Sequence, residues 1–494
     1  MKKKLNILFI ASECAPYAKT GGLSDVVSAL PIALTNLGHN VKIVIPKYSS
    51  IDTKKINMKK ILLPMCVHMG NCEEWCSVYS TQHNKNVTIY FIEYEKYFNR
   101  DGLYHDSKMN DFIDNPKRFA LLSNAAFQLC KDINYKPDVI HSHDWQSALS
   151  MIYLKEWYED DPYFKNTIGA LTIHNIGYQG KYPYENFGYL GFSDRLFNPN
   201  ILEDFGDINF LKGGIHYADI VNTVSPKYAE ETKTEEYSHG MHTFLIDKKD
   251  KYFGILNGID YEQWNPDIDK LIPYNYDENN ISEKSKCKLF LQEKINLKKD
   301  ENIPIIGIIS RFASQKGLNV LASVIEKVVM DIKVQFAILG SGDKSLENYF
   351  QSLTLKYSGK IGAFIGYDNQ LAHQIEAGVD FFIMPSLYEP CGLNQIYSLK
   401  YGTLPIVRAT GGLDDTIEQY NENTGDGTGF KFNDLTPQAI YDTIGWAVST
   451  FYDRKKHFQK MRKTAMKKNF SWKQSAEKYV DAYKKALEGN KNIS

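Results

Sequence analysis

Two loops in the second half of the sequence carry charged side chains next to glycines, a combination suited to binding a phosphorylated sugar. Arg311 and Lys316 lie in the first loop, Ser-Arg-Phe-Ala-Ser-Gln-Lys-Gly, which spans residues 310–317. Two fixed cations can neutralise a diphosphate and steady it as a leaving group. Two solvated surface cations would fit the same spacing, but the position after a predicted strand and before Gly317 favours the ligand-binding interpretation.

Glu389 stands at the start of the second loop, Glu-Pro-Cys-Gly-Leu-Asn-Gln, which leads into a predicted helix. Its carboxylate can accept hydrogen bonds from sugar hydroxyls or stabilise an oxocarbenium-like charge. The amides at a helix start can bind phosphate or hydroxyl oxygens. An acidic residue near a helix N-terminus is also favoured by the helix dipole alone. Thr410-Gly411-Gly412, after the next predicted strand, offers more backbone that a ligand can approach closely.

The first half has its own polar loops, each following a predicted strand. Lys19-Thr20-Gly21-Gly22 opens a helix and suits an anion, although a plain turn would look the same. Residues 141–145 read His-Ser-His-Asp-Trp, and residues 174–180 read His-Asn-Ile-Gly-Tyr-Gln-Gly. Such loops suit sugar recognition, because hydroxyls need several short donors and acceptors. A metal site and ordinary hydrogen-bonded histidines are the rival interpretations.

The charge balance excludes some classes of partner. The chain has 494 residues, 58 basic and 59 acidic, and a formal net charge of -1. This balance gives no overall attraction to nucleic acid or to anionic membranes. No apolar run reaches the roughly 18 residues that a membrane-spanning helix needs, and the apolar stretch after Lys2-Lys3-Lys4 predicts a buried strand, not a signal peptide.

The seven cysteines do not form a recognisable framework. Their number is odd and their spacing scattered, so disulfides are not expected. Cys66, Cys72 and Cys76 lie close together with His68 nearby, but this spacing matches no standard zinc site, and we predict no metal. Reduced thiols favour a cytoplasmic location.

Strands alternate with helices along the whole chain, which predicts parallel α/β sheets. Helices are expected over residues 23–37, 115–131 and 318–330. Strands are expected at residues 5–11, 41–45, 87–92, 138–141, 168–173, 219–224, 303–309, 336–339, 363–365, 381–384 and 405–407. The polar loops named above follow these strands, as expected for ligand sites at the carboxyl ends of parallel strands.

This pattern predicts two Rossmann-like domains facing across a cleft. The first would span residues 1–255 and the second residues 256–474. The turn-rich segment 254–266 is the expected linker. Residues 475–494 are predicted to form a helix that packs back on the first domain.

The motifs occur in the order found in bacterial glycogen synthases and plant starch synthases, and the chain resembles this family from about residue 5 to residue 475. Lys19 to Val26 resembles the N-terminal signature of the family, and the 310–317 loop its S-R-x-x-x-Q-K-G motif. Residues 389–395 look like E-P-C-G-L-x-Q. The match extends to residues 143–145, 174–175, 257–260, 401–403 and 410–413.

The resemblance implies a retaining GT-B glycosyltransferase that moves glucose from ADP-glucose or UDP-glucose to the non-reducing end of an α-1,4-glucan, without a cofactor. The catalytic positions it implies are Arg311 and Lys316 on the diphosphate, Glu389 and His174 at the glucosyl unit, and Asp144 near the acceptor. The substrate-binding positions it implies are Lys19, Gly21, Gly22, Asn257, Tyr367, Cys391, Gly392, Leu393, Thr410 and Gly411. Tyr367 would stack on the nucleobase. The family expectation is a same-face route in which the departing phosphate takes the acceptor's proton.

Two positions bear on which relatives the chain resembles most. Tyr397 stands where sucrose-type transferases have the second acidic residue of E-x7-E; glycogen and starch synthases also commonly lack that acidic residue, so Tyr397 favours them. His242 stands where a glycine is typical, which leaves acceptor preference open. The nucleotide is open as well. The alternatives are a GT-B relative with another acceptor or reaction, such as a sucrose-type synthase, a phosphorylase or an epimerase, and a non-catalytic glucan-binding paralogue.

Overall fold

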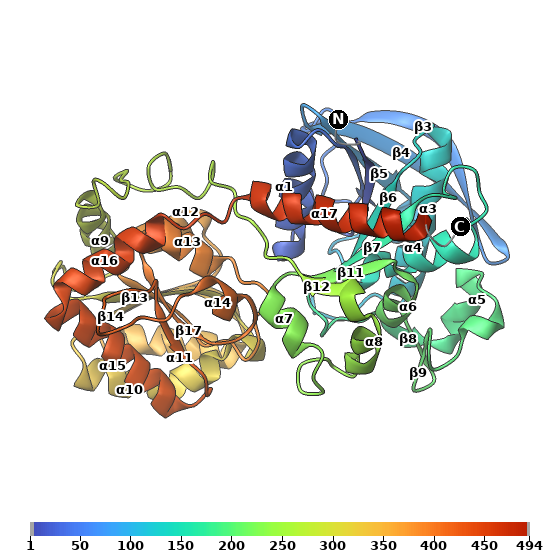
Figure 1. Ribbon diagram of the computed structural model, residues 1–494. Helices are drawn as coiled ribbons and strands as arrows, with labels where there is room; N and C mark the ends of the chain where they lie inside the picture. The colour runs from blue at the N-terminus through green and yellow to red at the C-terminus, as the bar shows by residue number, and fades with distance from the viewer. Residues whose placement is uncertain (1–3, 492–494) are drawn as a thin grey trace. The chain divides into compact units, whose positions relative to one another are not determined.

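The computed structural model describes residues 4–491 and divides into two compact units. Among the described residues, the first unit contains 4–224, 229–258 and 472–491, and the second contains 225–228 and 259–471. The chain therefore passes from the first unit to the second at Gly258–Ile259 and returns at Ser471–Trp472. Each unit is an α/β fold built around its own large sheet (Figure 1).

The first unit is built on a nine-stranded sheet of order β12-β11-β7-β6-β1-β2-β5-β4-β3. The strands from β12 to β5 pair in parallel, and β5, β4 and β3 pair antiparallel. The bounds are β1 Asn6–Ile10, β2 Asn40–Pro46, β3 Lys59–Met69, β4 Cys72–Asn84, β5 Val87–Glu93, β6 Val139–His143, β7 Ile168–Ile173, β11 Ile220–Thr223 and β12 Tyr252–Gly254. The direction of strand addition reverses between β1 and β6, so their carboxyl ends mark the switch point where such sheets bind ligands.

Helices cover both faces of this sheet, so its central strands are buried. All residues of β6 and β7 are buried, as a parallel strand between two helical layers requires. The helices of residues 4–258 are α1 Gly22–Asn36, α2 Glu95–Phe98, α3 Asn115–Asp132, α4 Trp145–Glu156, α5 Phe187–Leu190, α6 Phe210–Tyr217, α7 Pro226–Glu231 and α8 His242–Asp247. The C-terminal helix α17 (Trp472–Lys491) packs against α1 and β7, far from both in the sequence (Figure 1).

The β3–β4 hairpin was not predicted from the sequence. Its exposed side explains why: β4 alternates between buried and exposed residues over its first half, so it has no continuous apolar run. Pro64 lies within β3, and a proline is tolerated there because β3 is the edge strand. A small sheet of order β8-β10-β9 completes the unit, with β8 Lys181–Pro183, β9 Glu203–Asp204 and β10 Asp207–Asn209.

The second unit has a six-stranded, all-parallel sheet of order β15-β14-β13-β16-β17-β18. Counted within this unit, the order is 3-2-1-4-5-6, the order of the dinucleotide-binding Rossmann fold, and its switch point lies between β13 and β16. The strands are β13 Ile305–Phe312, β14 Gln335–Gly342, β15 Ile361–Ile365, β16 Phe381–Met384, β17 Leu404–Arg408 and β18 Phe430–Phe432. Each strand predicted from the sequence has a counterpart in the two sheets.

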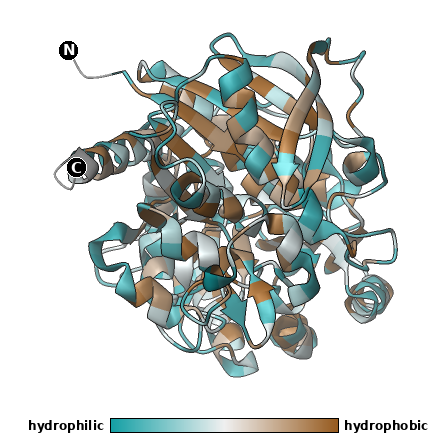
Figure 2. Ribbon diagram, turned by 90° about the vertical axis from the view of Figure 1, so that its right-hand side faces the viewer, coloured by the Kyte–Doolittle hydropathy of each residue, from teal (hydrophilic) through white to brown (hydrophobic). Residues whose placement is uncertain are grey.

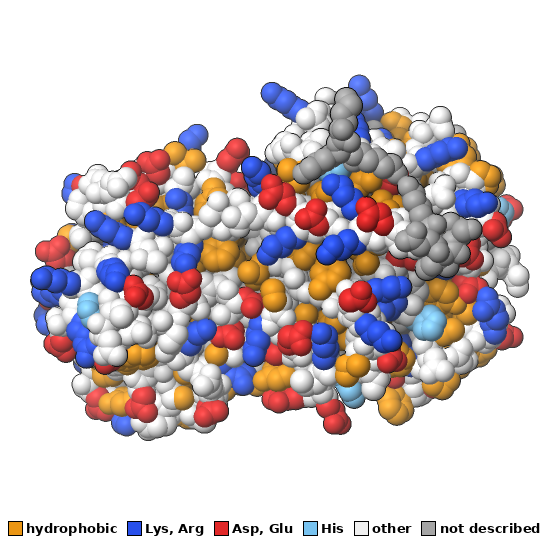
Figure 3. All heavy atoms as spheres, viewed as in Figure 1, with side chains coloured by type: hydrophobic (Ala, Val, Ile, Leu, Met, Phe, Trp, Pro, Cys, Tyr) orange, Lys and Arg blue, Asp and Glu red, His pale blue; other side chains and the backbone are white. Residues whose placement is uncertain are grey.

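The helices of the second unit enclose a core of aliphatic and aromatic side chains on the sheet. They are α9 Glu283–Lys294, α10 Leu318–Asp331, α11 Lys344–Lys356, α12 Asn369–Gly378, α13 Asn394–Lys400, α14 Gly411–Thr416, α15 Pro437–Asp453 and α16 Lys455–Met466. Hydrophobic residues, brown in Figure 2, are frequent on the strands, and hydrophilic residues, teal, on the loops. On the face drawn in Figure 3, acidic and basic side chains are interspersed. No helix within residues 4–491 combines the length and apolarity that a membrane crossing needs.

Candidate active site

Arg311 lies at the carboxyl end of β13, beside the switch point of the second sheet. The sequence predicted that a polar loop begins at this residue, and that boundary was wrong. β13 continues through Phe312 because Arg311 still pairs with Ser341 of β14. The side chain is exposed, and its guanidinium has no ion pair or hydrogen bond with any residue from 4 to 491. It is therefore a permanent positive charge that is available to an anionic ligand.

Lys316 and Glu389 form an ion pair across the switch point. The Lys316 Nζ donates to Glu389 Oε2 at 2.7 Å, and Ser386 Oγ donates to the same oxygen at 2.9 Å. Lys316 ends a short 3-10 turn after β13, and Ser386 and Glu389 follow β16. The Glu389 side chain is 8% exposed and that of Lys316 18%, so the pair is largely shielded from water. The carboxylate is thus held in one place by two donors from different loops.

Backbone contacts lock these two loops together. Leu387 N donates to Gln315 O at 2.8 Å, and Gln315 Nε2 donates to Tyr388 O at 3.1 Å. Gly317 has φ +64°, and a Cβ there would lie 1.8 Å from Pro385 O. Only glycine fits this close approach. The last residue of the S-R-x-x-x-Q-K-G loop must therefore be glycine because the loop packs against the loop after β16.

A third loop, after β17, contacts the backbone of Glu389. Gly412 N donates to Glu389 O at 3.0 Å, and a Cβ on Gly411 (φ +46°) would lie 2.0 Å from the same carbonyl oxygen. Thr410 is buried beside it, and Cys391 is buried as well. These predicted substrate-binding residues are therefore gathered within one backbone framework around Glu389.

The other predicted residues of the second unit lie close to this framework in the chain. Gly392 and Leu393 immediately precede α13, which Asn394 ties to the sheet by donating from Nδ2 to Ile309 O at 2.8 Å. Tyr367 follows β15, two strands away from the switch point, and its side chain is 81% exposed. An aromatic ring presented to solvent at the carboxyl edge of a sheet is available for stacking.

In the first unit, Asp144 follows β6 at the switch point in a strained conformation. Its φ is +55°, which is uncommon for a residue with a side chain and is found mainly where surrounding structure enforces it. The conformation turns the carboxylate toward the loop after β7, where Asp144 Oδ1 accepts from His174 N at 2.6 Å and from Asn175 N at 3.4 Å. Burial raises the pKa of Asp144 to about 7, although these two amides oppose the rise.

His143 and His174 share a hydrogen bond, with His143 Nδ1 and His174 Nε2 3.0 Å apart. Burial lowers the pKa of His174 to about 3 and that of His143 well below its usual value, so both rings are neutral at neutral pH. His143 Nε2 is buried without a partner among the described residues. A buried N–H without a partner is rarer than an unpaired acceptor, which assigns the donating proton to His143 Nδ1. His174 then carries its own proton on Nδ1.

A buried chain of hydrogen bonds connects this site to the C-terminal helix. Thr172 Oγ1 donates to Asn222 Oδ1 at 2.8 Å, so it must accept from His141 Nε2 at 2.6 Å. His141 Nδ1 is then an acceptor for the Tyr483 hydroxyl at 2.8 Å. Burial lowers the pKa of His141 to about 3, in agreement with this neutral tautomer. Helix α17 therefore supports the ends of β6 and β7.

The loop containing Lys19 is fixed by Glu13, which follows β1. Glu13 accepts from Thr20 N at 2.5 Å and from Thr20 Oγ1 at 2.6 Å. Gly21 is the N-cap of α1 and Gly22 its first residue, with open space around both. Lys19 itself is paired with Asp25 at 2.7 Å and is half exposed. The structure thus presents the predicted Gly-Gly amides at the same switch point as Asp144.

Asn257 lies elsewhere, in the segment that leaves the first unit. It is buried next to Gly258, whose Cα packs against the start of α17 at Trp472. Its Oδ1 has no partner among the described residues.

Comparisons with known proteins identify the family of the chain. Residues 6–247 match the starch synthase catalytic domain, and residues 290–468 match glycosyl transferases group 1. A glycogen synthase from Treponema denticola is 46% identical over 98% of this chain and 99% of its own length. Glycogen synthase 1 from Geobacter metallireducens is 43% identical over 98% of this chain and 97% of its own. The chain belongs to the glycogen and starch synthase family.

Solved structures place the fold in the same family. The catalytic domain of starch synthase IV from Arabidopsis thaliana, solved with ADP and acarbose, superposes with a TM-score of 0.90 at 29% identity, covering 98% of this chain and all of that one. Sucrose-phosphate synthase from Thermosynechococcus elongatus has a TM-score of 0.61 at 16% identity over 98% of this chain and all of its own, a likeness of fold alone. The GT-B fold, the family and the glycosyltransferase activity expected from the sequence are thereby confirmed, and the roles of individual residues stay predictions.

Three features of this synthase site were not found from the sequence. Ser386 gave no signal, since a serine after a strand is ordinary. Phe9, which stacks on His143 with ring centroids 5.0 Å apart, looked like any core residue of β1. Tyr483 lies in a helix more than 300 residues away from His141, and only the fold brings them together. The prediction that the tail is helical was the nearest signal.

Proposed function

We propose that this protein is a glycogen synthase that transfers glucose, with retention, from ADP-glucose to the non-reducing end of an α-1,4-glucan. The observation that carries the proposal is the Arg311–Lys316–Glu389 arrangement at a Rossmann switch point in a chain 46% identical to a glycogen synthase over nearly its whole length. The Arabidopsis relative bound to ADP supports an adenine nucleotide, and UDP-glucose is the alternative donor.

Arg311 and Lys316 are assigned to the diphosphate. The free Arg311 guanidinium can bind phosphate oxygens with two parallel N–H donors, and Lys316 adds a point charge. Negative charge grows on the departing diphosphate as the bond to the anomeric carbon breaks. Cations that are already in position stabilise that charge without reorganising, which is the larger part of the rate enhancement in such sites.

Glu389 is assigned to the glucosyl unit. Lys316 and Ser386 both donate to Oε2, and no bond to Oε1 occurs within residues 4–491, so Oε1 is available to accept from a sugar hydroxyl. A carboxylate held by two donors is well placed to offset positive charge on the sugar ring.

His174 and Asp144 are assigned to sugar recognition. Because the pKa of His174 is lowered to about 3, its ring is a neutral hydrogen-bonding group and not an acid that could protonate the leaving group. A nucleoside diphosphate is a good leaving group without such help. The reaction we propose therefore breaks the bond between anomeric carbon and phosphate oxygen and forms one to the acceptor hydroxyl on the same face. The acceptor's proton passes to the departing phosphate oxygen.

The test is product analysis. The protein is incubated with ADP-glucose and a maltooligosaccharide, and proton NMR follows the anomeric signals of donor and product. The proposal expects longer oligosaccharides whose new linkage is α-1,4, with ADP formed in equal amount. A β-linked product, or ADP released without chain extension, would contradict it.

A further inference from the structure

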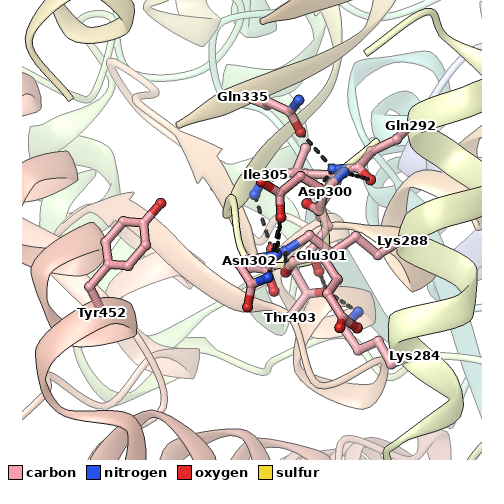
Figure 4. Close-up of polar contacts among 12 residues, drawn as sticks. Lys284, Lys288, Gln292, Asp300, Glu301, Asn302, Ile305, Gln335, Thr403 and Tyr452 are labelled. Carbon is pink, nitrogen blue, oxygen red and sulfur yellow. Dashed lines mark hydrogen bonds and ion pairs between the residues drawn. The ribbon is translucent and has the colours of Figure 1, made fainter. Parts of the chain in front are cut away.

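The second unit has a cavity of about 270 Å³ that the synthase chemistry does not use. Asp380, just before β16, and Asn302, just before β13, both line it. It therefore lies at the amino ends of these strands, at the edge of the sheet opposite their carboxyl ends. Figure 4 labels Asn302, Lys284, Lys288 and Tyr452 of its lining.

The cavity is lined by an unusual number of buried cations. Lys284, Lys288 and Arg462 are 3%, 4% and 8% exposed, and Lys455 stands exposed beside them. The two buried lysines come from α9, and Arg462 and Lys455 from α16. Lysine and arginine are almost never buried unless they are paired, so the partners of each decide what the cavity is for.

Lys288 is the one buried cation with a carboxylate partner. Its Nζ lies 2.7 Å from Asp380 Oδ2 and also donates to Glu301 O at 2.8 Å. Lys284 donates only to uncharged oxygens. The acceptors are Thr403 Oγ1 at 2.8 Å (Figure 4), Ala377 O at 2.9 Å, Glu376 O at 3.1 Å and Tyr276 Oη at 3.5 Å. Its charge is solvated by protein dipoles but is not neutralised.

Arg462 is less satisfied still. Its Nε donates to Gly402 O at 3.1 Å, and the two terminal nitrogens have no hydrogen bond or ion pair with any residue from 4 to 491. Its guanidinium carbon lies 5.4 Å from the centroid of the Phe458 ring, but a guanidinium normally engages several hydrogen-bond acceptors as well. Two free nitrogens on a residue that lines a cavity point to an acceptor supplied from outside the chain.

Nearby carboxyl groups offset only part of this charge. Asp380 is already paired with Lys288 and also accepts from Ile305 N at 3.0 Å. The Glu376 carboxyl is buried, and burial raises its pKa to about 8, so its neutral form predominates at neutral pH. Glu301 is exposed. With Lys284 protonated, the buried side chains that line the cavity therefore carry three positive charges and one negative charge.

We propose that this cavity binds a phosphate dianion, either free or as the phosphate group of a small monoester. An excess of two buried positive charges matches a dianion, and the Arg462 guanidinium offers the two N–H donors that bind phosphate oxygens side by side. The cavity also has room for more than the phosphate, since a water molecule occupies about 30 Å³ in the liquid. Phe451 and Tyr452 line it and provide an apolar wall for the rest of a monoester.

The probes are inorganic phosphate and ribose 5-phosphate, titrated into the full-length protein by calorimetry. Arg462→Gln should weaken binding by on the order of 10- to 100-fold, the usual range for a hydrogen-bonded buried charge. Lys455→Ala, at an exposed position that tolerates substitution, should weaken it by about 2- to 5-fold. Lys456→Ala is the matched control, because Lys456 is the exposed neighbour that does not line the cavity.

Arg311→Gln separates this site from the proposed donor site. We expect phosphate binding to survive Arg311→Gln and to weaken in the Arg462 and Lys455 variants. Tighter binding of ribose 5-phosphate than of phosphate would identify a monoester as the ligand, and equal binding would identify free phosphate. No saturable binding at millimolar phosphate, or binding that is lost only in Arg311→Gln, would overturn the proposal.

Proton uptake gives a second readout that does not depend on a variant. Burial and the Arg462 charge lower the pKa of Lys284 to about 7, so this lysine is partly deprotonated at slightly alkaline pH. A dianion nearby favours its charged form. At about pH 8, where both probes are already mainly dianions and release few protons on binding, heats measured in buffers of different ionisation enthalpy should therefore show uptake of a fraction of a proton. Binding without uptake would place the anion away from Lys284 and contradict the proposed site.

Discussion

Glu389→Gln keeps the size of the side chain and removes its charge, which makes it the sharpest test of the donor site. In the wild type, Glu389 Oε2 accepts from Lys316 at 2.7 Å and from Ser386 at 2.9 Å. An amide oxygen can accept both bonds, but Lys316 loses its counter-charge. Because the Lys316 side chain is 18% exposed, water can solvate part of the released charge. We expect the free energy of unfolding to fall by about 1 to 3 kcal/mol, which leaves the protein folded.

The effect on turnover should be larger than the effect on stability. Removing one preorganised group that stabilises transition-state charge costs about 3 to 4 kcal/mol, or about 100- to 1,000-fold in kcat. Initial rates of glucose transfer onto glycogen measure this, with circular dichroism and thermal melting as checks of folding.

Glu418→Gln is the control, since it breaks an exposed pair with Lys468 in the same unit. We expect it to change kcat less than twofold, because exposed pairs contribute little. A Glu389→Gln variant with a nearly normal rate would remove Glu389 from the site and refute the reasoning.

Three further outcomes are expected. Tyr483→Phe leaves His141 Nδ1 buried without a donor, so thermal melting should report a loss of about 1 to 3 kcal/mol, and an unchanged melting temperature would contradict the assigned tautomer. Stability in urea should rise with pH between about 3 and 6.5, because His141 binds a proton in the unfolded chain but not in the folded one. The raised pKa of Asp144, about 7, opposes that rise above pH 3.8, so Asp144→Asn should steepen it, and a flatter curve would contradict the sign. Tyr367→Ala should raise the KM for the donor by about 5- to 100-fold if the ring stacks on the base, whereas Tyr274→Ala, at another exposed tyrosine, should not.

The central strands and their loops could be predicted because the physical signal is local. A parallel strand between two helical layers favours a mainly apolar run, and β1, β2 and β7 have one, whereas β6 is apolar only at Val139 and Ile140. Ligand residues at the ends of these strands follow from topology, so Asp144 and His174 could be named without a structure.

Features that depend on long-range contacts could not be predicted. β13 runs three residues beyond its apolar stretch, which ends at Ile309, because β14 continues beside it, and this places Arg311 on a strand and not in a loop. The β3–β4 hairpin has one exposed side and lacks the continuous run of a buried strand. The unpaired guanidinium of Arg462 is invisible in the sequence, since only the fold decides which acceptors surround it.

A comparison of the two sugar-nucleotide donors is the most direct test of the proposed glucose transfer and of the cations that hold the diphosphate. Labelled ADP-glucose and UDP-glucose are supplied in parallel with glycogen, in the presence of EDTA, to wild type and to Lys316→Met. We expect transfer by the wild type, preferentially from ADP-glucose and insensitive to EDTA, because protein cations and not a metal hold the diphosphate. We also expect a loss of on the order of 100-fold in Lys316→Met. Absence of transfer from either donor by a folded wild-type protein, or transfer abolished by EDTA, would show that the proposed donor site is wrong.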